Sequence, residues 1–110
     1  MELTHSDRLK LRVDALGARL HEVSVELSAR KGQAFQAREQ LEAMCSQALM
    51  EGRPRPAEAG ALESDLQCHE SAIPALEEQE VSLKKLHLEA RRDHLRKLRE
   101  ERPSRWLILE

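Results

Sequence analysis

Apolar residues in the first half of the chain recur at alternating spacings of four and three residues. The clearest run spans nearly three heptads and consists of Leu9, Val13, Leu16, Leu20, Val23 and Leu27. This spacing aligns the side chains along one helix face, which predicts left-handed coiled-coil packing. The same phase continues through Arg30, Ala34, Ala37, Leu41, Met44 and Ala48. Because Thr4 and Asp7 resemble a capping box, we expect a first helix over about residues 5–51.

The second half of the chain carries a similar but more polar heptad series. Its members are Leu62, Leu66, His69, Ile73, Leu76, Glu80, Leu83, His87, Ala90, His94 and Lys97. They predict a second helix over about residues 61–102. Val81, Leu88 and Leu95 form another stripe, with a seven-residue repeat, on a different face. One apolar face is enough for a hairpin, so the second stripe predicts association into a helical bundle with a second copy or a partner.

Helix breakers are concentrated between the two series, in residues 52–60. Pro54 and Pro56 lack backbone donors, and Gly52 and Gly60, which flank them, tolerate positive φ. We therefore expect a turn here, which makes residues 1–110 a single all-α domain, a long antiparallel two-helix coiled-coil hairpin. A turn centred in this segment would bring together residues whose numbers sum to about 113.

Two further predictions concern the expected hairpin. In the register set by the turn, Arg30 and Glu80 fall one layer apart at seam positions, which predicts an ion pair that fixes the register. Pro74 interrupts the second helix and either kinks it or begins a new helix as its first residue. We favour the kink, because the seam phase continues from Ile73 to Leu76.

The composition is that of long helices and coiled coils, since Ala, Glu, Lys, Leu and Arg make up more than half of the 110 residues. One Trp, one Phe and no Tyr predict a thin apolar seam instead of a thick core. No apolar run approaches the roughly 18 residues that a membrane span needs, and Met1–His5 lack the basic and apolar regions of a signal peptide. A cytoplasmic protein without membrane contact is expected.

The net charge of −2 conceals a strong segregation of charge along the chain. Residues 1–38 carry 7 basic and 5 acidic groups, residues 39–80 carry 2 and 10, and residues 81–110 carry 9 and 5. A hairpin would join the two basic segments at its open end. The candidate basic patch consists of Lys84, Lys85, Arg91, Arg92, Arg96, Lys97 and Arg99. Acidic residues at intrahelical pairing distances favour a solvated, salt-bridged face over an acidic protein partner or nucleic acid.

The sequence contains no constellation typical of catalysis. We find no paired nucleophile and base, no glycine-rich phosphate loop and no residues that predict a pocket. No enzyme activity, cofactor, metal or small-molecule substrate is therefore expected. Cys45 and Cys68 are expected to be free thiols, with a disulfide or a zinc site as less favoured alternatives.

The C-terminal tail, residues 103–110, holds the sharpest functional signal. Its apolar residues are Trp106, Leu107, Ile108 and Leu109. One interpretation is that the tail folds back over Leu3 and Leu9. The other is a docking segment that adds as a strand or inserts its Trp into the groove of a partner.

These features predict a non-enzymatic adaptor, scaffold or regulatory protein that acts through a protein partner, self-association or both. The first alternative is a dimeric nucleic-acid-binding regulator that uses the basic end. The second is an oligomeric structural protein. In outline the expected hairpin resembles the central-stalk coiled coils of flagellar and type III secretion export machinery, which are small cytosolic antiparallel hairpins. This resemblance lies in the architecture, and it assigns a role to no residue.

Overall fold

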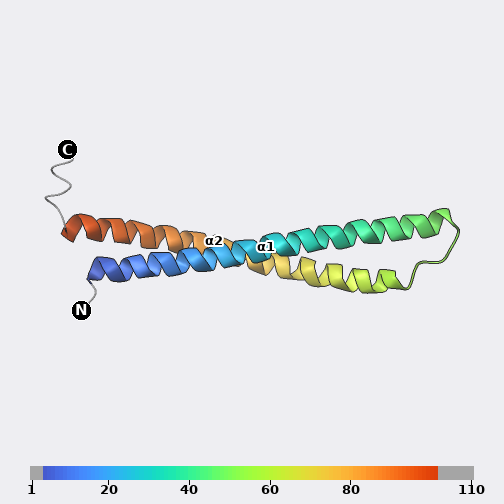
Figure 1. Cartoon of the computed structure of the whole chain (residues 1–110), viewed down its shortest axis with the longest axis horizontal. Coiled ribbons are helices and arrows are strands. Elements are labelled where there is room, and N and C mark those ends of the chain that lie inside the picture. Colours follow the sequence, from blue (N-terminus) through green and yellow to red (C-terminus); the bar gives the residue numbers. More distant parts are fainter. Residues whose placement is uncertain (1–3, 102–110) are drawn as a thin grey trace. The chain divides into compact units, whose positions relative to one another are not determined.

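The computed structural model describes residues 4–101, which form two helices joined by a short connection. Helix α1 (His5–Met50) and helix α2 (Glu58–Glu101) run in opposite directions and pack against each other (Figure 1). No strand occurs in the described range. The predicted all-α antiparallel hairpin is therefore confirmed.

The chain divides into two compact units, each built from one part of both helices. Unit 1 contains residues 4–22 of α1 and 79–101 of α2 within the described range, and unit 2 contains residues 23–78. Each unit has its own seam between the two helices.

A reciprocal capping box starts α1. The backbone N–H of Asp7 donates to Thr4 Oγ1 at 3.1 Å, and the backbone N–H of Thr4 donates to Asp7 Oδ2 at 3.2 Å. These bonds satisfy donors that have no partner inside the helix. The cap predicted from the Thr4–Asp7 spacing is thus present.

Gly52 ends α1 in a left-handed conformation, with φ of 67°. The N–H of Arg53 donates to the Ala48 carbonyl at 2.8 Å, and the N–H of Gly52 donates to the Leu49 carbonyl at 3.2 Å. This pair of bonds defines a Schellman motif, which favours glycine at the position after the helix end.

Gly60 differs from the expectation, because it lies inside α2 and not in the turn. The N–H groups of Ala59 and Gly60 already donate to the carbonyls of Pro56 and Ala57, at 3.1 and 3.3 Å. Proline is well suited to a helix start, since it needs no donor there and its φ is already helical. Helix α2 consequently begins at Glu58, earlier than the expected residue 61.

Pro74 lies within α2, which continues through it as one helix. The alternative of a new helix beginning at Pro74 is therefore wrong, and the kink remains a prediction.

The seam of unit 2 is narrow and consists largely of alanine. The buried apolar residues of this unit are Val23, Leu27, Ala34, Ala37, Ala48, Ala59 and Leu76. Small side chains allow two helix backbones to approach closely, but they remove little apolar surface from water. The thin seam expected from the composition is present here.

Unit 1 has even less core. Among its described residues only Ser6 and Ala90 are buried, while the seam residues Leu9, Leu16 and Leu83 are half-buried. His87 packs over Gly17, where an added Cβ would lie 3.2 Å from His87 Nε2. The absence of a side chain at Gly17 makes room for the imidazole.

The observed register differs from the predicted sum of about 113. Ser6 Oγ donates to Glu101 Oε2 at 2.6 Å, a pair whose numbers sum to 107. The residue numbers sum to 104 for the contact between Gly17 and His87, and to 108 for the ion pair between Arg38 and Glu70. The early start of α2 explains the shift, because Met50 and Glu58, which bound the connection, also sum to 108.

Candidate functional site

The predicted second stripe of α2 is solvent-exposed in unit 1. Val81, Leu88 and Leu95 are 67%, 47% and 50% exposed. Lys85 and Arg92 lie between them at spacings of three and four residues and are also exposed. We call these five residues the basic stripe, which faces away from the seam formed by Leu83, His87 and Ala90.

The cations of the predicted basic patch differ in whether they form ion pairs. Lys84 pairs with Glu80 at 3.4 Å, Arg96 with Asp93 at 3.0 Å and Lys97 with Glu100 at 3.0 Å, all within α2. Lys85, Arg91 and Arg92 make no ion pair with any residue between 4 and 101. Arg99 is exposed. The basic stripe therefore contains two exposed cations without an ion pair to any described residue.

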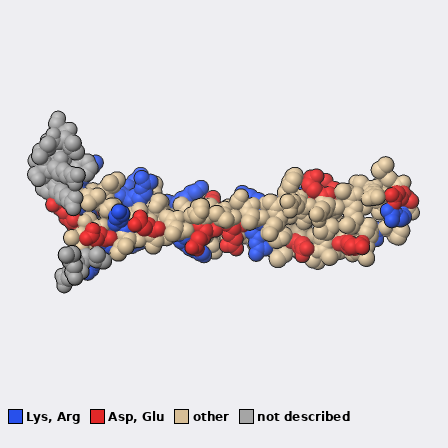
Figure 2. Space-filling view, in the orientation of Figure 1, with Lys and Arg blue, Asp and Glu red and all other residues tan. Residues whose placement is uncertain are grey.

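The cations that form ion pairs are compensated by acidic residues of the same helix. The Lys97 ammonium donates a hydrogen bond to Glu100 and attracts its negative charge, and both effects lower the pKa of that carboxyl; Arg96 and His5 add to the shift. Figure 2 shows acidic and basic side chains interspersed on the visible face of unit 1. Near the turn, the visible face of unit 2 carries mostly uncharged and acidic side chains (Figure 2).

Arg30, a predicted seam residue, has a hydrogen-bond partner within unit 2. Its Nη1 lies 3.0 Å from His69 Nδ1, and because a guanidinium only donates, the imidazole nitrogen accepts. Glu80 lies in unit 1 and pairs with Lys84. The predicted ion pair between Arg30 and Glu80 remains a prediction.

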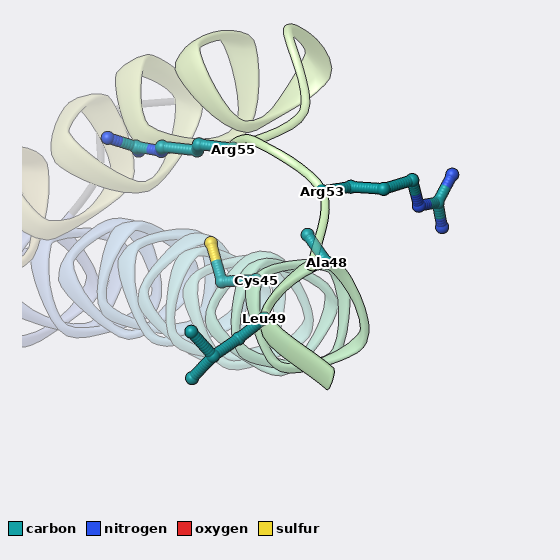
Figure 3. Close-up of a pocket in the computed structure, with 5 residues that line it drawn as sticks. All are labelled: Cys45, Ala48, Leu49, Arg53 and Arg55. Carbon is teal, nitrogen blue, oxygen red and sulfur yellow. The ribbon is translucent and has the colours of Figure 1, made fainter. Parts of the chain in front are cut away.

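Unit 2 has a small hollow beside the connection, of about 300 Å³, lined by Cys45, Ala48, Leu49, Arg53 and Arg55. In Figure 3 the Arg53 side chain extends away from Cys45 and Leu49. Arg53 pairs with Glu51, and Arg55 pairs with Glu63. Both guanidinium charges are thus already compensated, and the hollow offers no unpaired charge to a ligand.

Both cysteines are free thiols, as expected, with Cys45 half-buried and Cys68 exposed. Across residues 4–101, no three His, Cys, Asp or Glu side chains are grouped as ligands for a metal ion. Neither helix of the described chain has an apolar stretch long enough to cross a membrane.

A second exposed face, on α1 in unit 2, was not predicted from the sequence. Phe35 and Leu49 are 60% and 83% exposed, and Glu39 and Glu42 lie exposed between them. We call these four residues the acidic stripe. Neither glutamate makes an ion pair within the described residues. The available signal was the 14-residue spacing of Phe35 and Leu49, which falls outside the seam phase.

The predicted docking tail, Trp106, Leu107, Ile108 and Leu109, lies outside the described residues. Its role remains a prediction.

Comparison of the chain with models of protein families, with curated proteins and with solved structures finds no match.

Proposed function

We propose that this chain is a non-enzymatic adaptor or scaffold that binds another protein through the basic stripe of α2. The observation that carries the proposal is the exposure of Val81, Leu88 and Leu95 at seven-residue spacing. Apolar side chains with this spacing fit the groove or seam of a helical partner. Scattered exposed leucines need no explanation, whereas a regular row on one helix face does.

The charges of the stripe define the chemistry of the partner. Lys85 and Arg92 occupy the spaces between the apolar residues and lack intramolecular ion pairs within residues 4–101. A partner helix with apolar residues at heptad spacing and acidic residues between them would match both the apolar residues and the cations of the basic stripe. The apolar contacts would supply most of the affinity, and the charges would favour the correct partner and register.

The thin core of unit 1 supports the same proposal. Its described seam buries only Ser6 and Ala90, so this part of the hairpin removes little apolar surface from water by itself. A partner helix on the basic stripe would cover Leu88 and its neighbours and add apolar burial that the two helices lack. The predicted tail residues around Trp106 would act as a second docking segment.

Photo-crosslinking in cells tests the proposal. A photoreactive phenylalanine analogue replaces Leu88 in the full chain, and the same analogue at Ser82, exposed on another face of α2, is the control. We expect a discrete adduct from position 88 that is absent from position 82 and is lost after Lys85→Glu with Arg92→Glu. Mass spectrometry then identifies the adduct.

The identity of the adduct separates the candidate functions. An adduct with a different protein supports the adaptor proposal. If the only adduct is with a second copy, the adaptor proposal is overturned and an oligomeric structural role is supported. No adduct, together with DNA or RNA binding that falls steeply with salt, supports the nucleic-acid-binding alternative. Repeating the experiment with a chain that ends at Arg102 tests the tail, which has no role in docking if the adducts are unchanged.

A further inference from the structure

The acidic stripe on α1 shares two properties with the partner expected for the basic stripe, namely exposed apolar residues and acidic residues between them. Phe35 and Leu49 provide exposed apolar side chains, and Glu39 and Glu42 provide the acidic residues between them. The acidic stripe lies in unit 2 and the basic stripe in unit 1. Resting on the proposed role of the basic stripe as a docking surface, we infer that, while no other protein is bound there, it docks the acidic stripe of a second copy of this chain.

The two stripes match in length. Phe35 and Leu49 are 14 residues apart, as are Val81 and Leu95, which corresponds to about 21 Å along either helix. When the stripes lie side by side, their apolar ends therefore meet. The apolar ends meet in either orientation, but the parallel one places Glu39 opposite Lys85, whereas the antiparallel one places Arg38 opposite Arg92.

The charges between the apolar ends are complementary. Glu39 and Glu42 would lie among Lys85, Leu88 and Arg92 of the second copy. None of these four charged residues makes an ion pair within residues 4–101, so the contact would break no existing pair. Partly exposed pairs of this kind add little affinity each, but like charges in the same places oppose association.

Self-association would also bury apolar side chains that are exposed on both stripes. Phe35 is the only phenylalanine of the chain, yet it is 60% exposed. A contact between unlike stripes would cover exposed apolar side chains on one stripe of each copy.

Charge reversal with rescue tests the inference in the full chain. Lys85→Glu with Arg92→Glu makes the basic stripe acidic, and Glu39→Lys with Glu42→Lys makes the acidic stripe basic. Asp65→Lys with Glu78→Lys is the matched control, because these exposed acidic residues lie on neither stripe. Mass is measured by analytical ultracentrifugation over a concentration series, and circular dichroism verifies the helix content of every variant.

We expect the mass of the unchanged chain to rise above 12.6 kDa as its concentration increases. Each stripe variant alone should dissociate, with a dissociation constant raised about tenfold or more, while the control remains a dimer. An equal mixture of the two stripe variants should regain dimers, because the reversed charges attract again. A merely structural effect of the substitutions would not produce this rescue.

Two results would overturn the inference. The first is a chain that remains monomeric across the series, and the second is a mixture of variants that fails to reassociate. Neither outcome decides the proposed function. A monomer whose position 88 crosslinks to a different protein refutes self-association and retains the adaptor. A rescued dimer whose only adduct is a second copy refutes the adaptor and retains self-association.

Discussion

Replacement of Gly52 by alanine should destabilise the hairpin, whereas the same replacement at Gly32 should stabilise it. Gly52 has a φ of 67°, and the Schellman bonds to Ala48 and Leu49 depend on that conformation. An alanine in the left-handed region costs about 1–2 kcal/mol, which is partly offset by about 0.4–1 kcal/mol from the stiffer unfolded chain. The expected net loss for Gly52→Ala is about 1 kcal/mol.

Gly32 is the matched control, because replacing it by alanine should raise the stability and not lower it. It lies within α1, and an added Cβ would meet nothing within 4 Å. Alanine is favoured over glycine in a helix interior by about 1 kcal/mol, so Gly32→Ala should gain that amount. The two variants should therefore differ by about 2 kcal/mol, or roughly 8 °C in Tm for a chain of this size.

Urea unfolding followed by circular dichroism measures both free energies. The protein concentration is kept where the unfolding midpoint no longer depends on it, so that self-association does not contribute. Gly52→Asn is a further control, because asparagine tolerates the left-handed region better than alanine and should lose less stability. If Gly52→Ala proved as stable as the unchanged chain, the assigned end of α1 would be incorrect.

Three other substitutions test the seam, the helix start and the charges of α2. Ala34→Leu should cost about 1–3 kcal/mol by overpacking the seam of unit 2, and an unchanged unfolding free energy relative to exposed Ala43→Leu would contradict the close approach of the helices. Thr4→Ala should lower the free energy of unfolding by about 1 kcal/mol, because the cap is lost, and Thr4→Ser should retain most of that stability. Equal Tm values for the two variants would refute the capping box. Lys97→Met should raise the pKa of Glu100 toward its ordinary value in an NMR titration, and an unmoved pKa would exclude Lys97 as the main cause. Because folding lowers that pKa, the stabilisation from Glu100 is present above the unfolded pKa and is lost as pH falls through the folded value; its exposure keeps the effect small.

The sequence was sufficient to predict the helices, because their signals are local and repeated. Heptad spacing from Leu9 to Leu27 and the Thr4–Asp7 cap identified α1, and the cluster of breakers separated it from α2. The register was harder to predict, because it depends on where the connection starts and ends. Proline at position 56 allowed α2 to begin early, and that local detail shifted the register from the predicted one.

The candidate site was predicted in part, for a similar reason. Val81, Leu88 and Leu95 stand out because their repeat continues over three members. The acidic stripe has only two apolar residues, since glutamate occupies position 42, where the repeat would place an apolar residue between Phe35 and Leu49. A repeat with a charged member is indistinguishable from an ordinary solvated face until the exposure of its neighbours is known.

The distribution of burial links the stability of this chain to its proposed interactions. Described residues of unit 1 bury only Ser6 and Ala90, whereas unit 2 buries seven apolar residues. The unit with less core therefore carries the basic stripe, where a bound helix would add the missing apolar contacts. Any partner that binds the folded hairpin but not the unfolded chain stabilises it by mass action. Docking on the basic stripe should accordingly strengthen the seam of unit 1 most, because unit 2 already contains most of its own buried contacts.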